Sequence, residues 1–434
     1  MIIPRTRVFW SISISHTVVD IFSASVPVLL TFLSGHLMAL TNTQIGFAIS
    51  AYQMTGALSQ PFAGLLADRG GGRWLGSFGL LWVVGFQALA LILATLTHQY
   101  VLLVIPLTLA ALGSGAFHPV GAMHATSKTS ASIGSLSLFF FMGQFGGGLG
   151  PALAGILLDS AASNNAVFTA ALGPVLEGRL AETGSVVPML FLGLIAVPCF
   201  LFMAFSLPTV RAFRTARQHA ATAANGAPRQ RVMVAPLLVL ALVIMLRGLV
   251  NPGLAAFLPR LFQSQGWTPS EYGLITSTYW LAGAFSGLLA GYLADRLGSR
   301  MLIALSLLLS APAVFLLGTA DGVFAFVLAL SIGAFSGSSH SLLVASAQRY
   351  VPSGKGFASG ASLGFIFAMG AIGVLVIGAF ADRFGMGGAF QIVGGITLVT
   401  GVLAFLLPAD RRPQPTVVLT PEVSAEQIAR AETV

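Results

Sequence analysis

The chain has 434 residues, of which 56% are hydrophobic and only 8% are charged, and its mean hydropathy is +0.89. Soluble domains carry roughly 25% charged residues. A soluble chain of this size could not bury so many apolar residues on all sides, so the composition predicts an integral membrane protein. The single cysteine, Cys199, excludes an internal disulfide and argues against a thiolate metal cluster.

Twelve apolar stretches are long enough to cross a bilayer, which requires about 20 residues. They lie at 8–33, 43–66, 75–96, 100–124, 132–157, 186–207, 234–262, 270–292, 300–320, 322–347, 355–380 and 387–407. Arg5 and Arg7 precede a first stretch that is much longer than the core of a signal peptide, so we expect this stretch to remain in the protein.

The positions of the Lys and Arg residues predict the orientation in the membrane. With the N-terminus in the cytoplasm, seventeen of the 21 fall in cytoplasmic segments, three fall at or beyond the outer edge, and Arg247 falls within the membrane. This distribution follows the positive-inside rule, so both termini are expected in the cytoplasm. The net charge of +8 therefore reflects topology and does not indicate nucleic-acid binding.

The chain repeats itself after 227 residues. The segment 64–69 returns almost unchanged as 291–296, and Tyr52 and Arg73 match Tyr279 and Arg300. Repeated halves are typical of secondary transporters. We expect two six-helix units at 1–207 and 234–407, joined by a cytoplasmic linker at 208–233 that lacks an apolar face and followed by a cytoplasmic tail at 408–434.

The repeated turn resembles the signature of the major facilitator superfamily, G-x-L-a-D-r-x-G-r-k. Gly72 and Ser299 depart from it where a basic residue is expected, and the matching residues are Gly64, Leu66, Asp68, Arg69, Gly71 and Arg73, and Gly291, Leu293, Asp295, Arg296, Gly298 and Arg300. This resemblance covers nearly the whole chain and implies an all-α membrane fold of twelve helices in two six-helix bundles, working as a monomer.

The resemblance also implies a conformational lock at the repeated turn, made by Gly64, Asp68, Arg69 and Arg73 with Asp295, Arg296 and Arg300 in the second copy. An Asp at a helix end can meet cationic side chains and a helix N-terminus in one state of a transporter and lose them in the other. The alternative is that Asp68 only caps a tight turn.

The stretch at 132–157 resembles the antiporter signature of drug–proton exchangers, G-x8-G-x3-G-P-x-x-G-G. Ser137 and Ala154 depart from it, and the matching residues are Gly146, Gly150, Pro151 and Gly155. Small residues allow close helix packing and proline bends a helix, so the four residues are predicted to form a packing hinge. The alternative is close packing without a role in antiport.

Three further features occur together: His16-x3-Asp20, the segment 113–119 (Gly-Ser-Gly-Ala-Phe-His-Pro), and Arg247 with the segment 257–259 (Phe-Leu-Pro). In these features the chain resembles the fosmidomycin-resistance branch, whose members export a phosphonate antibiotic. Leu109 stands where drug exchangers usually carry an Arg, so proton coupling through that residue is not expected.

His16 and Asp20 are predicted to be the proton-coupling residues. They are four residues apart and share one helix face, and an acid beside an imidazole inside the membrane can exchange a proton at physiological pH. The alternatives are a structural hydrogen-bonded pair or ligands for a transported divalent metal. No further acidic or His cluster is expected in the facing helices, so no metal and no cofactor is predicted.

Arg247 is predicted to bind an anion. A charged Arg in the middle of a membrane costs about 2.5–3.5 kcal/mol or more, which a partner must offset. We expect Asp20 to pair with it when the site is empty and an anionic substrate to replace Asp20 when that residue is protonated. The alternative is a purely structural ion pair.

Four further residues are predicted to bind substrate: His118, Tyr52, Tyr279 and His340. Pro119 follows His118 and is expected to unwind a turn of its helix near mid-membrane, a usual place for a transporter's binding site. The alternative for His118 is a hydrogen bond to carbonyls that Pro119 frees. For the two tyrosines the alternative is ordinary packing.

The sequence contains no phosphate-binding loop and no hydrolase motif, so an enzyme is not expected and an ion gradient is the driving force. The expected function is proton-coupled export of a small anionic or amphipathic compound across the inner membrane by alternating access. The alternatives are ion-coupled uptake of an organic anion, transport of a lysolipid-like amphiphile, or a membrane sensor that transports nothing. The expected partners are the substrate, protons and the lipid bilayer.

Overall fold

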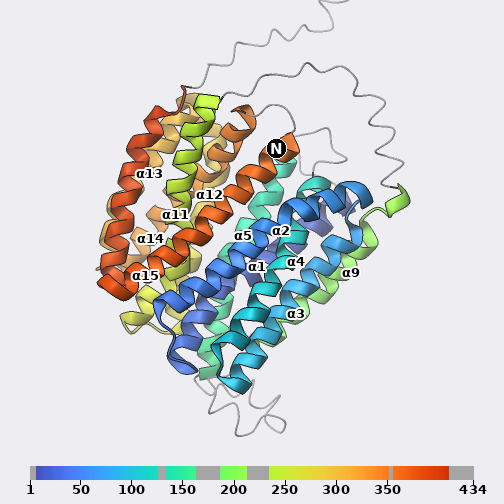
Figure 1. The fold of residues 1–434 in the computed structure, drawn as a ribbon, viewed down its shortest axis with the longest axis horizontal. Helices are drawn as coiled ribbons and strands as arrows, with labels where there is room; N and C mark the ends of the chain where they lie inside the picture. Colours follow the sequence, from blue (N-terminus) through green and yellow to red (C-terminus); the bar gives the residue numbers. More distant parts are fainter. Residues whose placement is uncertain (1–5, 126–132, 163–185, 213–233, 351–354, 410–434) are drawn as a thin grey trace, which may run out of the picture.

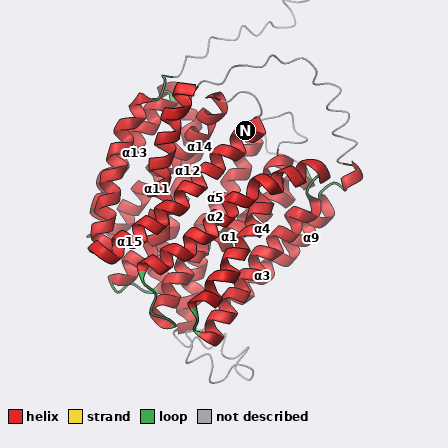
Figure 2. Ribbon diagram, viewed as in Figure 1, coloured by secondary structure: helices red, strands yellow, loops and turns green. Residues whose placement is uncertain are grey.

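The computed structural model describes residues 6–125, 133–162, 186–212, 234–350 and 355–409, and the described residues contain helices and no strand (Figure 2). In the N-terminal half the helices are α1 (Arg7–His36), α2 (Asn42–Gly70), α3 (Arg73–Thr97), α4 (Tyr100–Ala125), α5 (Ile133–Ala162), α8 (Val187–Leu192) and α9 (Ala196–Ser206). In the C-terminal half they are α11 (Val234–Ser264), α12 (Pro269–Leu297), α13 (Ser299–Leu317), α14 (Gly322–Tyr350) and α15 (Lys355–Leu403). Most of the predicted linker and the predicted tail from residue 410 lie outside the described residues.

The described helices coincide with the twelve predicted spans. A short 3-10 turn at Gly193–Ile195 joins α8 to α9, so these form one bent rod in place of the predicted sixth helix. Gly385 interrupts α15 with a φ of 74°, a conformation that glycine adopts without strain, and divides it into the predicted eleventh and twelfth helices. The predicted all-α fold is therefore confirmed.

The two halves lie side by side, with the helices from α1 to α9 on one side and those from α11 to α15 on the other (Figure 1). Within the halves, α1 packs on α5 and α3 on α4, while α11 packs on α15 and α12 on α14. Across the boundary, α5 packs on α12 and α2 packs on α15. Helices that are far apart in sequence thus form the interface where a site shared by both halves would lie.

The repeat seen in the sequence recurs in the local structure of α2 and α12. Each begins with a capping box, in which a Thr side chain accepts from the backbone of the residue three positions later and that residue's side chain accepts in return. Thr41 pairs with Gln44 in α2, and Thr268 pairs with Glu271 in α12. The two boxes are 227 residues apart, the same separation as the repeated turns.

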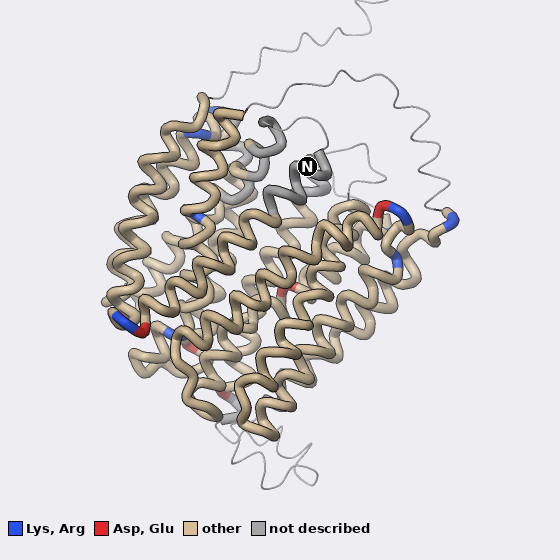
Figure 3. The backbone as a smooth tube through the Cα atoms, in the orientation of Figure 1, with Lys and Arg blue, Asp and Glu red and all other residues tan. Residues whose placement is uncertain are grey.

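The outer surface fits a lipid environment. Among the described residues, nine helical segments are long and apolar enough to span a membrane, and charged residues gather mainly at the helix ends (Figure 3). Large apolar side chains are exposed between these ends, for example Phe62 at 70% and Phe285 at 56%. The less apolar α2 and α12 are not among the nine, and both helices line the boundary between the halves.

Two glycine crossings hold the halves together near the beginnings of α2 and α12. A Cβ added at Gly46 would lie 3.0 Å from the carbonyl oxygen of Val374, and one added at Gly155 would lie 3.1 Å from Cα of Gly273. Gly46 and Gly273 are equivalent positions in the repeat. The halves therefore meet at the end of the molecule opposite to the Asp68 turn, which is the predicted outer end.

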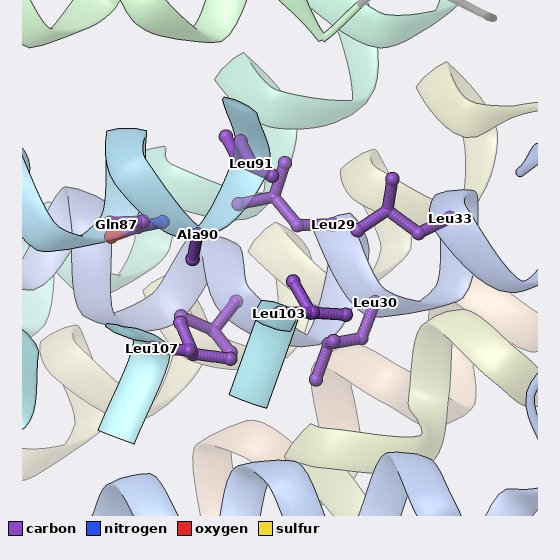
Figure 4. Close-up of a pocket in the computed structure, with 9 residues that line it drawn as sticks. Leu29, Leu30, Leu33, Gln87, Ala90, Leu91, Leu103 and Leu107 are labelled. Carbon is purple, nitrogen blue, oxygen red and sulfur yellow. The ribbon is translucent and has the colours of Figure 1, made fainter. Parts of the chain in front are cut away.

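A small cavity lies within the N-terminal half among α1, α3 and α4 (Figure 4). Its lining is apolar except for Gln87, which donates to the carbonyl oxygen of Phe22 (3.3 Å) and to Ser25 Oγ (3.2 Å). No charged residue lines it. The groups that could couple ions to substrate lie elsewhere.

Candidate functional site

His16, Asp20 and His118 form one polar cluster, here called the His–Asp–His cluster. His16 Nε2 lies 3.3 Å from Asp20 Oδ2, and His118 Nε2 lies 3.4 Å from Asp20 Oδ1, so each carboxylate oxygen faces one imidazole. The His16 side chain is 3% exposed, whereas those of Asp20 and His118 are each 22% exposed. The cluster is therefore largely enclosed by protein but accessible on its Asp20–His118 side.

Both imidazoles are anchored through their other ring nitrogen. His16 Nδ1 lies 2.9 Å from the carbonyl oxygen of Phe139 on α5, and His118 Nδ1 lies 2.8 Å from the carbonyl oxygen of Ser114 on α4. Carbonyl oxygens only accept hydrogen bonds, so both Nδ1 atoms carry a hydrogen and donate. These bonds fix both rings with Nε2 directed at Asp20.

Packing on α5 holds the cluster in place. The His16 ring stacks on Phe139 with a centroid separation of 4.1 Å and meets His118 edge-on at 5.0 Å. A Cβ at Gly143 would collide with the His16 ring and would lie 2.7 Å from Asp20 Oδ2. The sequence analysis did not identify Gly143, although it lies one helical turn before Gly146 in the same glycine-rich helix.

The predicted unwound turn at Pro119 is wrong. The helix α4 continues from Tyr100 to Ala125 with Pro119 inside it, because a proline removes only one backbone N–H and the neighbouring bonds persist. The alternative interpretation of His118, a bond to a backbone carbonyl, is closer to the structure. The acceptor, however, is the carbonyl oxygen of Ser114. The carbonyl group that Pro119 leaves without a helical N–H donor is that of Gly115.

Arg247 lies buried in the C-terminal half, with 6% of its surface exposed. It donates from Nε to Ser339 Oγ (2.8 Å) and from Nη2 to the carbonyl oxygen of Ser336 (2.9 Å), both on α14. The Asn251 amide oxygen, in the orientation that satisfies both groups, accepts from Nε and Nη2 at 3.1 Å each. Sequence reasoning missed Asn251, which lies one helical turn after Arg247 on α11.

The expected Asp20–Arg247 pair does not form in this conformation. Within the described part of the chain, the ion pairs of Asp20 are with the two histidines, and Arg247 binds uncharged groups of α11 and α14. Each charged group thus finds its partners inside its own half. The negative charge expected to offset Arg247 is not supplied by Asp20 here.

The two predicted tyrosines lie in comparable environments. The Tyr52 hydroxyl on α2 lies 2.9 Å from Ser23 Oγ on α1, near Asp20, and Tyr279 on α12 lies beside Ser336 on α14 and near Arg247. Both are buried, at 7% and 8% exposure. Each tyrosine therefore borders one of the two charged groups. The side chain of His340, the remaining predicted substrate residue, lies outside the described residues.

The predicted lock lies at the end of α2. Asp68 and Arg69 are exposed there, and Arg296 is exposed at the equivalent end of α12, while the Asp295 side chain lies outside the described residues. The chain turns through Gly71 (φ 75°) and Gly72 (φ 68°) before α3 begins at Arg73. His124 on α4 anchors this turn, since its Nε2 lies 2.7 Å from the carbonyl oxygen of Gly71.

The departure at Gly72 from the family's signature has a steric reason. Most residues other than glycine are strained at a positive φ. A Cβ at Gly72 would also lie 2.6 Å from a methyl group of Val120 on α4. The basic residue that the signature expects at this position does not fit.

The glycine-rich segment of α5 packs as closely as predicted. A Cβ at Gly146 would lie 2.7 Å from Cα of Thr17, and one at Gly150 would lie 3.1 Å from Cα of Ile21, both on α1. After Pro151, the backbone N–H of Ala152 donates to Ser277 Oγ on α12 (2.8 Å). The segment contacts both the helix of the His–Asp–His cluster and the opposite half, and its role as a hinge stays a prediction.

A set of polar contacts that sequence reasoning missed joins the halves at the outer end. Arg260 on α11 donates from Nε to Asn42 Oδ1 (3.1 Å) and from Nη1 to Ser34 Oγ (2.9 Å). Asp382 on α15 accepts from the backbone N–H groups of Asn42 (2.9 Å) and Thr43 (2.8 Å), where the α2 dipole favours a negative charge. We call these the outer polar contacts.

His118 on α4 joins His16 and Asp20 in one group of three possible metal-ligating side chains, a juxtaposition that the sequence analysis did not identify. One ligand atom from each of the three residues lies within 4.8 Å of the others. Structural zinc sites hold four protein ligands. The described residues bring no fourth His, Cys, Asp or Glu to this group.

Comparisons with known proteins agree with this architecture. A sequence model of the Major Facilitator Superfamily matches residues 236–430. The fosmidomycin resistance protein of Escherichia coli (strain K12) is 25% identical over 405 residues, which cover 92% of each chain. The chain is thus similar to members of the major facilitator superfamily over nearly its whole length.

Further matches to this transporter extend the comparison. An uncharacterized transporter of the superfamily from Bacillus subtilis (strain 168), YfnC, is 42% identical over 132 residues, which cover 30% of this chain and 32% of that protein. A bacterial homologue of the human lysosomal transporter Spinster, solved in an inward-facing, occupied conformation, has a TM-score of 0.76 at 14% identity, covering 92% of this chain and 96% of that one. A D-xylose–proton symporter has a TM-score of 0.73 at 16% identity, with 92% and 97% covered. The YfnC protein, the Spinster homologue and the xylose symporter are described as transporters, in line with the expectation from the sequence.

Proposed function

We propose that this transporter exports a small anionic or amphipathic compound in exchange for protons, with fosmidomycin-like phosphonates as the substrate class. The proposal rests mainly on the buried environment of Arg247. Its guanidinium is buried, and no ion pair with a carboxylate forms among the described residues. An Arg side chain stays charged, and a buried charge without a counterion is costly, so a negatively charged ligand is the natural partner.

The chemistry of the guanidinium supports the substrate class. Its planar fork binds carboxylate and phosphonate groups through two parallel hydrogen bonds. The name of the E. coli relative, which aligns over nearly the whole chain, points to the phosphonate fosmidomycin. Tyr279, which borders Arg247, and Tyr52, His118 and His340 are the further candidates for substrate contact.

We assign proton coupling to Asp20 and His16. An ionisable group inside a membrane is expensive and usually serves function, and imidazole is the side chain that most readily exchanges protons near neutral pH. Asp20 retains 22% exposure, so protons can reach it. It lies in the half opposite to Arg247, so one conformational change can act on both.

In this proposal the protein works as a monomer in the inner membrane, with both termini in the cytoplasm. Alternating access results when its two halves, the units 1–207 and 234–407, rock against each other. The outer polar contacts hold the outer end closed and must break when that end opens. The residues proposed to lock the inner end are Gly64, Asp68, Arg69, Arg73, Asp295, Arg296 and Arg300, and those proposed to act as the hinge are Gly146, Gly150, Pro151 and Gly155.

A susceptibility panel in an efflux-deficient bacterial host tests the proposal. The wild-type transporter should raise the inhibitory concentration of fosmidomycin, and Arg247→Ala, expressed to the same level in the membrane, should not. Arg383→Lys is the control, since Arg383 is exposed just before the Gly385 bend of α15. Resistance to cationic compounds with none to any anionic compound would contradict the proposed substrate class.

A further inference from the structure

The hydrogen-bond partners of the His–Asp–His cluster determine how many protons it holds. Both Nδ1 hydrogens are engaged by carbonyl oxygens, those of Phe139 and Ser114. A neutral imidazole with a hydrogen on Nδ1 has a bare lone pair on Nε2. Both Nε2 atoms face carboxylate oxygens of Asp20, which also carry lone pairs when ionised. Without further protons, both contacts would therefore place one acceptor against another.

Each of the two contacts needs its own proton to become a hydrogen bond. The proton between His16 and Asp20 can sit on the imidazole or on the carboxyl group, and the same holds between His118 and Asp20. A carboxylic acid carries only one O–H, so protonating Asp20 satisfies one contact and leaves the other imidazole to carry its own proton. Every arrangement that satisfies both contacts has two protons more than the bare cluster, and at least one ring is an imidazolium.

Besides its own residues and Tyr52, the cluster faces no titratable group or counter-charge among the described residues, and the Ser114 hydroxyl lies at Nδ1 of His118 (3.3 Å), not at Nε2. Among the described residues, the titratable groups facing Asp20 are His16 from α1, His118 from α4 and Tyr52 from α2. The Tyr52 hydroxyl is engaged with Ser23, and α5 contributes the carbonyl of Phe139 and the bare backbone of Gly143. The count of two protons therefore depends on the cluster alone.

We propose that His118 completes a site that holds two exchangeable protons in this conformation, and that the transporter exchanges two protons for each substrate molecule. This inference rests on the proposed proton-coupled export and adds its stoichiometry. Loss of the two protons turns both Nε2–carboxylate contacts from attractive to repulsive, which releases α4 from α1. A cluster of His16 and Asp20 alone would carry one such proton.

The reversal potential of fosmidomycin flux in proteoliposomes measures the stoichiometry. Wild-type transporter should balance a fosmidomycin gradient against a proton gradient at two protons per molecule, and His118→Gln should shift this ratio to one. His98→Asn is the control, because His98 lies at the outer end of α3, has a positive φ that Asn tolerates, and is remote from the cluster. A wild-type ratio of one contradicts the two-proton site and leaves proton-coupled export standing, whereas a ratio of zero contradicts proton coupling itself.

A second measurement needs no substrate. In 15N NMR of histidine-labelled transporter in lipid nanodiscs, the His16→Gln and His118→Gln variants assign the two signals. We expect an Nδ1 hydrogen on both rings and an imidazolium on at least one of them at the pH at which transport is driven. Two neutral rings at that pH would overturn the inference, because Asp20 can hold only one of the two protons.

Discussion

Asp20 and Arg247 occupy equivalent positions in the two halves of the transporter. They are separated by 227 residues, as are Tyr52 and Tyr279 and the two capping boxes that begin α2 and α12. The repeat thus places an acid at one position and a base at its counterpart. Each binds a neighbouring helix of its own half, Asp20 through His118 on α4 and Arg247 through Ser336 on α14.

In the proposal, this relationship assigns proton exchange and anion binding to different halves of the protein. In the proposed cycle the N-terminal half exchanges protons and the C-terminal half binds the anion. The two equivalent helices α1 and α11 contact each other, so a shift in one half is transmitted to the other through packing. The following predictions test the parts of this account separately.

Arg247→Lys should weaken fosmidomycin binding at least tenfold, equivalent to about 1.4 kcal/mol. Lysine keeps the charge but loses the fork that binds Ser336, Ser339 and the anion together. Binding measured by calorimetry on purified protein checks this, with Arg383→Lys as control. Affinity within twofold of wild type for both Arg247→Lys and Arg247→Ala would leave only a structural role for this residue.

Asp20→Asn should abolish uphill efflux while preserving the exchange of labelled for unlabelled substrate across the membrane. The amide cannot take up and release the protons that link the two gradients, yet it keeps the size of the carboxyl group. Efflux and exchange in the same vesicle preparation separate the two effects. Uphill efflux with an unchanged pH profile would locate the coupling site elsewhere.

Gly143→Ala should disrupt proton coupling without removing any polar group. The added methyl collides with the His16 ring and approaches Asp20, so the cluster must separate, and overpacking of this kind costs about 1–3 kcal/mol. The readout is the ratio of protons to substrate transported. Gly147→Ala is the matched control on the same helix, because its nearest neighbour, Trp280, is 3.8 Å away. Equal ratios in the two variants would contradict the tight fit.

Asp382→Asn combined with Arg260→Gln should shift the resting protein toward the outward-open state. These changes weaken the outer polar contacts, which join the halves only while the outer end is closed. Distances between spin labels across the outer end should lengthen. The only native cysteine, Cys199, is buried. Asp321→Asn is the control, since Asp321 contacts Trp267 and Gly322 within one half. An unchanged distance distribution would show that the contacts do not control the outer end.

Asp68→Ala should cripple transport while leaving membrane insertion intact, and the matching change at Asp295 should have a smaller effect. The proposed lock contacts at the inner end are expected to form in one state only, so their loss should alter the cycle and not the fold. Surface labelling measures insertion, and initial efflux rates measure transport. Wild-type rates for Asp68→Ala would exclude the lock.

Much of the fold follows from the sequence because the membrane restricts the chain to helices long enough to span it. The twelve spans, the repeat and the Asp-Arg turns were therefore readable from apolar runs and spacing. The rotation of each helix about its own axis could not be predicted in this way. The His118–Asp20 contact, the Ser336 and Ser339 contacts of Arg247, and the Asp382 contact with α2 depend on which face each helix presents to its neighbours. A membrane helix is apolar on all sides, so its sequence pattern does not show which face packs against a neighbouring helix.

Two further differences between expectation and structure have local causes. The proline rule predicted a break at Pro119, but one missing hydrogen bond did not interrupt α4 among the neighbouring intact bonds. The simplest pairing of opposite charges predicted Asp20 with Arg247. The structure satisfies each charge closer to its own helix, by imidazoles in one half and by hydroxyl, amide and carbonyl groups in the other.

The direction of proton movement during fosmidomycin efflux tests the central claim most directly. Vesicles of a single protein orientation, loaded with fosmidomycin and a pH-sensitive dye, would report substrate release and internal pH together. The account predicts that protons enter as fosmidomycin leaves, and that Asp20→Asn abolishes this proton entry while exchange of labelled substrate continues. Protons that leave together with fosmidomycin, or proton entry that persists in Asp20→Asn, would contradict it.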